Sequence, residues 1–130
     1  MKAKKVCVID DDEIYQFTMR HNVLKLNNEN SVLKFINGQQ AIDFLEKNQK
    51  KVALWPDVIF LDINMPTLDG WGFLEQFATI AFKAQQSVTL YVVSSSIDEI
   101  DYNRALSIPL VHDYIIKPLT LEKLQSLIYQ

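Results

Sequence analysis

Five residues of this 130-residue sequence combine side chains suited to chemistry with positions directly after apolar runs. Asp10 and Asp11 follow one run, and Asp62, Ser94 and Lys117 each follow or end another. Carboxylates brought close together do not all stay ionised unless a cation lies among them, and a single lysine supplies too little positive charge. A hard divalent ion with oxygen ligands would balance the charge, and Mg²⁺ is the usual ion where phosphate is also bound. Gathered at one place, these groups would suit phosphoryl transfer, in which a carboxylate attacks phosphorus while cations and a hydroxyl stabilise the phosphoryl oxygens.

The apolar runs that precede these residues predict strands. They are rich in Val and Ile, and their near-continuous apolarity is typical of a parallel sheet that is covered on both faces. The runs are 6–9, 32–36, 58–61, 89–93 and 113–116.

Segments with apolar residues at helical spacing follow each run. The spaced residues are Ile14, Phe17 and Leu24; Ala41, Ile42 and Leu45; Phe73, Leu74, Phe77 and Ile80; Ile97, Ile100 and Ala105; and Leu121, Leu124 and Ile128. Five such β-α units predict an α/β fold, with an open parallel sheet between two layers of helices. Ligands of such sheets bind beyond the carboxyl ends of the strands, where the polar residues lie.

Composition and charge exclude several classes of protein. Thirteen basic against sixteen acidic residues give a net charge of −3, which leaves no excess of positive charge for general nucleic-acid binding. No apolar stretch approaches the length that spans a membrane, and Cys7 has no second cysteine with which to form an internal disulfide. We therefore expect one domain over residues 1–130 of a cytoplasmic protein without membrane insertion, a monomer or weak dimer.

Short motifs recur in a fixed order at the predicted strand ends. They are Val8-Ile9-Asp10-Asp11, Asn37-Gly38 with Ala41, Leu61-Asp62 with Met65-Pro66, Asp69-Gly70 with Leu74, Val92-Val93-Ser94, and Tyr114-Ile115-Ile116-Lys117-Pro118. From about residue 6 to residue 127, the chain resembles the CheY-like receiver domains of response regulators. The resemblance implies a flavodoxin-like (βα)5 three-layer sandwich with strand order 2-1-3-4-5. That order places the first and third strands side by side, which β-α periodicity alone does not show.

The resemblance also implies a metal site. Asp11 would ligate Mg²⁺ directly, and Asp10 would act beside it, through water. Asp62 would share the ion, and Asn64 would contribute its backbone carbonyl. The chemistry of these oxygens agrees with the preference of Mg²⁺.

The remaining roles that the resemblance implies concern the phosphoryl group and the switch. Asp62 would be the phosphoacceptor, and Ser94 would hydrogen-bond the phosphoryl group. Lys117 would pair with Asp62 and then with a phosphoryl oxygen. The Lys117-Pro118 peptide bond that follows is often cis in this family. Tyr114 would change rotamer on activation.

Two positions bear on how the switch would behave. Ser94 replaces the more usual threonine and keeps the hydroxyl while losing a methyl group. Ser96 and Asn64 flank the path expected for the hydrolytic water. The sequence therefore does not predict the lifetime of the phosphoryl group.

Together these features predict a regulatory switch of a two-component phosphorelay, and not a metabolic enzyme. A sensor histidine kinase or a histidine phosphotransfer protein would phosphorylate Asp62 in the presence of Mg²⁺, and the change of charge would bias a two-state element. Because the sequence ends soon after the fifth predicted helix, we expect no output domain and a downstream protein partner. That partner would bind the surface formed by 97–106, 111–114 and 121–128.

Two alternatives share parts of this pattern. A Mg²⁺-dependent phosphohydrolase of the haloacid-dehalogenase kind would use Asp10-x-Asp12, Ser94 and Lys117. It also needs an acidic pair after the lysine, where only Glu122 follows, and it leaves Asp62 without a role. A flavin- or nucleotide-binding module would place glycine or hydroxyl residues after the first strand, where four consecutive acids would instead repel phosphate.

Several polar residues have simpler explanations. Asp12 and Glu13 are expected to start the first helix, and Asp69 is expected in a turn or as an N-cap. Ser95 and Ser96 are candidates for the cap of the fourth helix or for the lining of the site. His21 and His112 lie away from the expected site, so we do not expect either to accept phosphate.

Overall fold

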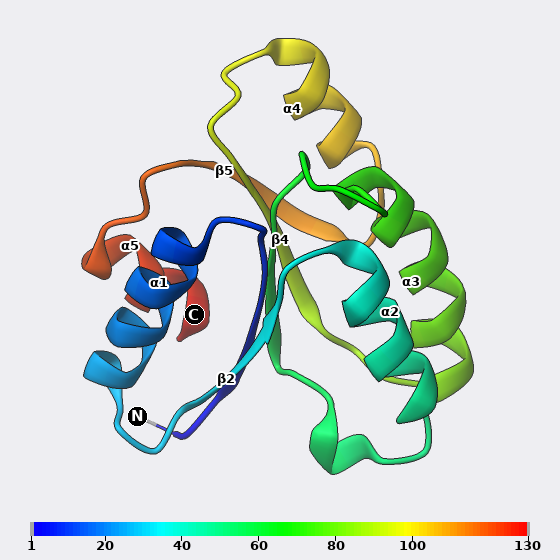
Figure 1. Ribbon diagram of the computed structural model, residues 1–130, viewed down its shortest axis with the longest axis horizontal. Helices are drawn as coiled ribbons and strands as arrows, with labels where there is room; N and C mark the ends of the chain where they lie inside the picture. The colour runs from blue at the N-terminus through cyan, green and yellow to red at the C-terminus, as the bar shows by residue number, and fades with distance from the viewer. Residues whose placement is uncertain (1, 130) are drawn as a thin grey trace.

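A five-stranded parallel sheet forms the centre of the structure, a computed structural model that describes residues 2–129 (Figure 1). The strand order is β2-β1-β3-β4-β5, which confirms the expected topology. The strands are β1 (Lys5–Ile9), β2 (Ser31–Phe35), β3 (Val58–Leu61), β4 (Thr89–Ser94) and β5 (Val111–Ile116). Every pair of neighbouring strands is parallel, so their carboxyl ends meet at one edge of the sheet.

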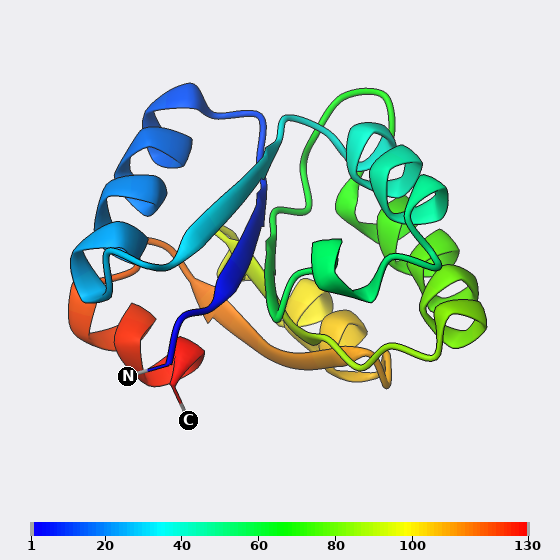
Figure 2. The ribbon, with the colours of Figure 1, turned by 90° about the horizontal axis from the view of Figure 1, so that it is seen from below.

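The helices form two layers around this sheet (Figures 1 and 2). The layer on one face contains α1 (Glu13–Leu26) and α5 (Leu121–Ile128). The layer on the other face contains α2 (Gly38–Lys47), α3 (Gly70–Ala84) and α4 (Glu99–Leu106), and the short 3₁₀ helix η1 (Val52–Leu54) precedes β3. None of the helices within residues 2–129 combines the length and apolar character that a membrane crossing requires.

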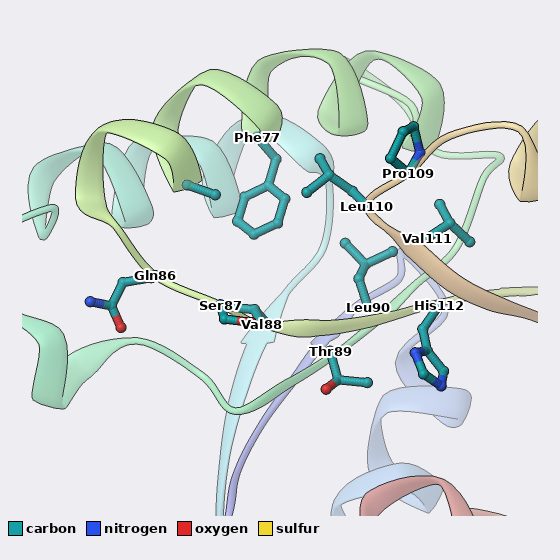
Figure 3. Close-up of a pocket in the computed structure, with 11 residues that line it drawn as sticks. Phe77, Gln86, Ser87, Val88, Thr89, Leu90, Pro109, Leu110, Val111 and His112 are labelled. Atoms are coloured by element: carbon teal, nitrogen blue, oxygen red, sulfur yellow. The ribbon is translucent and has the colours of Figure 1, made fainter.

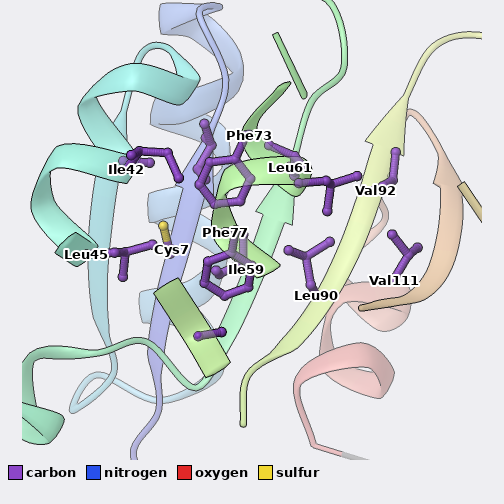
Figure 4. Close-up of a cluster of buried hydrophobic side chains, with 14 of the residues drawn as sticks. Cys7, Ile42, Leu45, Ile59, Leu61, Phe73, Phe77, Leu90, Val92 and Val111 are labelled. Atoms are coloured by element: carbon purple, nitrogen blue, oxygen red, sulfur yellow. The ribbon is translucent and has the colours of Figure 1, made fainter. Parts of the chain in front are cut away.

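The alternation of side chains along each strand divides the core into two clusters. In β1, Cys7 packs with the helices α2 and α3 (Figure 4) and Ile9 belongs to the same cluster, whereas Val6 and Val8 pack with α1 and α5. All four side chains are fully buried, as expected for strands that are covered on both faces. Burial raises the pKa of the Cys7 thiol, which agrees with a packing role for this residue and not a redox role.

The starts of α1, α3 and α4 are set by aspartate caps. Asp12 accepts hydrogen bonds from the backbone N–H groups of Ile14 and Tyr15, and Asp69 accepts one from that of Gly72. The cap of α4 is Asp98, which corrects the expectation that Ser95 or Ser96 would cap this helix.

The helical spacing of apolar residues does not identify the buried face of α1. Ile14 and Phe17 are 79% and 74% exposed, whereas Gln16, Met19 and Val23 are buried against the sheet. The hydrogen bonds of Gln16 described below explain why this face turns inward.

A similar difference affects the segment after β4. Ile97 precedes α4 and is 82% exposed, and Ile100, within the helix, is 74% exposed. Ala105 is the fully buried member of the three, so α4 contacts the core through its last turn. The fifth strand also begins at Val111, two residues before the apolar run that predicted it.

Candidate functional site

The acidic residues meet at the carboxyl ends of β1 and β3. Ile9 lies opposite Leu61 in the sheet, so the next residues along the two strands, Asp10 and Asp62, are neighbours. The backbone N–H of Asp62 donates to the carbonyl of Ile9 at 2.9 Å. Each of Asp10, Asp11 and Asp62 offers a carboxylate oxygen, and these three oxygens lie within 4.8 Å of one another. The structure therefore brings together the acids that the sequence singled out.

Lys117 reaches this cluster from the end of β5. Its backbone N–H donates to the carbonyl of Ser94, which fixes the start of the lysine side chain beside β4. Nζ lies 2.8 Å from Oδ2 of Asp10 and 4.0 Å from Oδ1 of Asp62. The shorter ion pair is thus with Asp10, whereas the resemblance implied a pair with Asp62. The Lys117-Pro118 bond is cis.

The charge of the site is only partly balanced by this lysine. Burial and then the charge of Asp10 raise the pKa of Asp62, Lys117 opposes both effects, and the net result is a pKa of about 6. Asp10 is 1% exposed and Asp62 is 9% exposed, so both carboxylates are largely removed from water. A cluster of this kind favours a further cation.

Gln16, which the sequence interpretation missed, anchors the backbone that holds Asp10. Its Nε2 lies 3.0 Å from each of the carbonyl oxygens of Val8, Asp10 and Phe35, so its two N–H groups serve three acceptors and one hydrogen is shared. Three acceptors on two strands hold the end of β1 beside β2 and orient the turn into α1. The available signal was a polar residue at the i, i+3, i+7 spacing of a buried helix face, with Met19 and Val23.

The two oxygens of Asp10 already have partners. Oδ1 accepts from the backbone N–H of Asp12 at 2.9 Å, and Oδ2 accepts from Lys117. Asp11, in contrast, is exposed and accepts no hydrogen bond from the residues that the structure describes. Asp11 is therefore the carboxylate most available to an incoming ion.

Ser94, at the end of β4, is buried and is linked to the loop that follows. Its Oγ accepts from the backbone N–H of Ser96 at 3.1 Å. The carbonyl of Ser96 accepts from the Tyr114 hydroxyl at 2.8 Å, and the Ser96 hydroxyl donates to Asp101 of α4 at 2.9 Å. The ring of Tyr114 also meets that of Tyr102 edge to face, with centroids 5.7 Å apart. One loop residue thus joins the site to β5 and α4.

Asn64 and the two histidines singled out from the sequence all lie at the protein surface. Asn64 is exposed, two residues beyond Asp62. His21 and His112 are exposed and do not belong to the acidic cluster.

A pocket at the opposite edge of the sheet is separate from this site (Figure 3). Its lining includes Ser87 and Thr89 at the start of β4 and Pro109 and Val111 at the start of β5. These residues precede or begin the strands, whereas the acidic residues follow them. The pocket therefore belongs to the amino ends of the strands.

Comparison with known families agrees with this geometry. Residues 6–129 match the family described as the response regulator receiver domain. The chain belongs to this family. It is a regulatory signalling domain of two-component systems and not a metabolic enzyme, and receiver domains interact with histidine kinases or phosphotransfer proteins. The comparisons give no support to the phosphohydrolase alternative.

Individual relatives of this receiver domain are similar to it in sequence or in structure. This chain is 30% identical over 126 residues to a probable C4-dicarboxylate response regulator from Halalkalibacterium halodurans, and the match covers 97% of this chain and 50% of that protein. The chain therefore spans about half the length of this relative. A crystal structure of a two-component response regulator from Cytophaga hutchinsonii has a TM-score of 0.82 at 29% identity, with 98% of this chain and 95% of that chain covered.

A more distant neighbour is the receiver domain of a sensor histidine kinase from Pseudomonas aeruginosa. Its TM-score is 0.79 at 19% identity, with 98% of this chain and 95% of that chain covered. That structure has a magnesium ion coordinated in its active-site cleft.

Proposed function

We propose that this receiver domain takes up a phosphoryl group on Asp62 in a Mg²⁺-dependent reaction. The observation that supports this best is the arrangement of the charges. Three carboxylate oxygens lie within 4.8 Å of one another, and one ammonium lies 2.8 Å from Asp10 and 4.0 Å from Asp62. A structural ion pair would need one acid for one lysine, whereas this cluster retains excess negative charge.

The oxygen ligands of this cluster suit a hard divalent ion such as Mg²⁺. Asp11 would hold the ion directly, Asp10 would act beside it and Asp62 would share it, with the backbone carbonyl of Asn64 as a further ligand. A bound divalent ion would supply positive charge that neutralises the carboxylates and the phosphoryl oxygens. The family and the acid cluster support this assignment together.

In the transfer itself, a carboxylate oxygen of Asp62 attacks the phosphorus atom. The bond from phosphorus to the donor breaks, and its electron pair leaves with the donor, which is a histidine nitrogen in a protein donor or an acetate oxygen in acetyl phosphate. Lys117 lies close enough to neutralise an oxygen of the transferred group. The Ser94 hydroxyl accepts a hydrogen bond from Ser96, so its own proton is available to donate to a second phosphoryl oxygen.

We further propose that the signal leaves through α4, β5 and α5 to a protein partner. The contacts of Ser96 link Ser94 to Tyr114 and Asp101, so a displacement of Ser94 towards a phosphoryl group would pull on β5 and α4. This surface also exposes apolar side chains that a partner would cover. They are Ile100, Tyr102 and Leu106 of α4 and Ile116 of β5.

Intact-protein mass spectrometry after treatment with acetyl phosphate and Mg²⁺ tests the first proposal. The wild-type protein should gain one phosphoryl group, and Asp62→Asn should gain none. Asp43→Asn, which removes an exposed carboxylate from α2, serves as the matched control and should behave like the wild type. A phosphorylated Asp62→Asn protein would assign the acceptor to another residue.

A spectroscopic comparison tests the second proposal. Backbone amide resonances of α4 and β5 should shift when the wild-type protein is phosphorylated, and those of α2 should shift less. Unchanged resonances in α4 and β5 would contradict the proposed output surface.

A further inference from the structure

Tyr15 is an aromatic residue in direct contact with the charged site. It lies in the first turn of α1, and Nζ of Lys117 is 4.2 Å from the centre of its ring. The same ammonium is 2.8 Å from Asp10 and 4.0 Å from Asp62. The ring face is therefore the third contact of Lys117, and it is the only one of the three that carries no charge.

The surroundings of Tyr15 make the ring, and not the hydroxyl, the functional part of this side chain. The hydroxyl is buried and has no hydrogen-bond partner among the described residues. Burial, and then the charges of Asp10 and Asp62, raise the pKa of Tyr15 further above its ordinary range. The side chain is therefore neutral at physiological pH, and its ring packs against the buried cluster shared with Val6 and Val8. What Tyr15 offers to Lys117 is the negative face of a neutral aromatic ring.

We propose that Tyr15 is a positioning residue that holds the Lys117 ammonium at the site while Lys117 exchanges one carboxylate partner for another. This inference rests on the proposed phosphorylation of Asp62. When Asp10 shares its charge with a divalent ion, its attraction for Lys117 falls. The lysine has a flexible stem and a strongly hydrated ammonium, and its side chain is 21% exposed, so a lysine released by Asp10 would move into water.

The ring provides an anchor that this exchange leaves intact. A cation–π contact uses no carboxylate oxygen, so it does not compete with a metal ion for ligands. It keeps the ammonium on the inner side of the site, where Asp62 is already 4.0 Å away. Lys117 is thereby held where the phosphoryl oxygens would lie. The conformational entropy of its side chain is lost before the reaction and not during it.

Three variants separate the ring from the rest of the side chain. Tyr15→Phe keeps the ring and removes the buried hydroxyl, whereas Tyr15→Leu removes the ring. Tyr15→Met, a second variant without a ring, replaces Tyr15→Leu if the leucine variant does not fold. Each is made in the wild-type protein and in a Lys117→Met background, and phosphorylation by acetyl phosphate at saturating Mg²⁺ is followed by mass spectrometry.

We expect Tyr15→Phe to react within about twofold of the wild-type rate and Tyr15→Leu to react about tenfold more slowly, as a partly buried cation–π contact allows. In the Lys117→Met background, Tyr15→Leu should slow the residual reaction no further, because the residue through which Tyr15 acts is absent. The ε-methylene protons of Lys117 should show a ring-current shift in the wild type and in Tyr15→Phe. This shift should be lost in Tyr15→Leu.

Three results would overturn the inference: a wild-type rate in Tyr15→Leu, an equal loss in Tyr15→Phe, or a further loss in the Lys117→Met background. A failure of the proposed function is distinguishable from all of these. In that case the wild-type protein itself would take up no phosphoryl group on Asp62.

Discussion

The Tyr114 hydroxyl donates a 2.8 Å hydrogen bond to the backbone carbonyl of Ser96. Ser96 in turn donates its backbone N–H to Oγ of Ser94 at 3.1 Å, so only one loop residue separates the aromatic ring of β5 from the hydroxyl at the site. Tyr114 is 6% exposed, which shows that its ring is packed inward while this hydrogen bond is in place. Ser96 is thus hydrogen-bonded both to Ser94 and to Tyr114, the two residues expected to form the switch.

Removing this hydrogen bond should loosen the loop without disabling the site. Tyr114→Phe keeps the ring and its contact with Tyr102, and it leaves the Ser96 carbonyl without its donor. We expect the free energy of unfolding to fall by about 1 kcal/mol. The rate of phosphorylation of Asp62 should stay within about twofold of the wild-type rate, and the amide resonances of α4 should shift. Tyr102→Phe, which removes a hydroxyl from the same ring pair, is the control and should match the wild type in urea unfolding.

A paired carboxylate usually stabilises the folded protein more as the pH rises, because its pKa is lowered. Asp62, whose pKa is raised, should have the opposite effect. Its pKa is about 6 in the folded protein against an ordinary value of 3.8, so the folded state binds a proton between about pH 4 and pH 6 that the unfolded state has lost. The contribution of Asp62 to the free energy of unfolding is therefore highest below this window and decreases as the pH rises through it. Above pH 6 the buried charge is a net cost.

Asp62→Asn should accordingly stabilise the metal-free protein at pH 7.5. The shift corresponds to at most about 3 kcal/mol, and the partial access of water to the site lowers this figure. The difference between variant and wild type should shrink towards zero near pH 4, as measured by urea unfolding in the presence of a chelator. The exposed Asp43→Asn is the control. A variant less stable than the wild type at pH 7.5 would show that Asp62 is stabilised by its neighbours instead.

The sequence predicted the elements of this fold better than it predicted the contacts between them. The apolar runs that predicted β1, β3 and β4 are each followed directly by a polar residue, so these runs located Asp10, Asp62 and Ser94 at the edge of the sheet. The β-α periodicity does not predict the strand order, which was inferred from the resemblance of the motifs to receiver domains. Nζ of Lys117 lies 2.8 Å from Asp10 and 4.0 Å from Asp62, and no spacing in the sequence predicts which of these two ion pairs is the shorter.

The orientation of α1 shows why part of the site was missed. Apolar spacing favoured a face with Ile14 and Phe17, both of which are exposed. The observed face instead buries Gln16, because its amide NH₂ donates to backbone carbonyls at the ends of β1 and β2. Such a tertiary hydrogen bond overrides a local apolar pattern. The position of Tyr15 beside Lys117 follows from the same rotation of the helix.

The hydrogen bonds of Gln16 lead to a strong prediction for stability. Gln16→Leu fills a similar volume and leaves the carbonyls of Val8, Asp10 and Phe35 without this donor. We expect a loss of about 2–3 kcal/mol in the free energy of unfolding, because buried carbonyls lose a donor, although that of Phe35 still accepts from the backbone N–H of Asp10. Gln39→Leu, at a half-buried position of α2 where the amide donates only to the exposed Asp43 carboxylate among the described residues, should change the urea midpoint little. Equal midpoints for the two variants would contradict the anchoring role of Gln16.

The two adjacent acids after Asp10 should differ in their effect on metal binding. Asp11 is exposed and free to ligate, whereas Asp12 caps α1 through its side chain. Asp11→Asn should weaken Mg²⁺ binding by about tenfold or more, while Asp12→Asn removes the same charge, preserves the cap and should weaken it far less. Calorimetric titration with Mg²⁺ measures both. Similar losses in the two variants would mean that the site responds to the overall charge and not to a specific ligand.

Gly70 controls the position of the acceptor itself. A Cβ on this residue would lie 2.5 Å from the backbone carbonyl oxygen of Asp62 and 2.8 Å from Cα of Ile63, so Gly70→Ala must displace the backbone that holds the acceptor. We expect a loss of about 1–3 kcal/mol in stability from this overpacking, with a clear drop in the rate of phosphorylation. Gly72→Ala is the matched control, because its Cβ would meet mainly the side chain of Leu68, which can move aside. Acetyl phosphate kinetics and urea unfolding of the pair therefore separate a general packing effect from displacement of Asp62. If Gly72→Ala slowed phosphorylation as much as Gly70→Ala, the close contact between Gly70 and Asp62 would not determine the position of the Asp62 carboxylate.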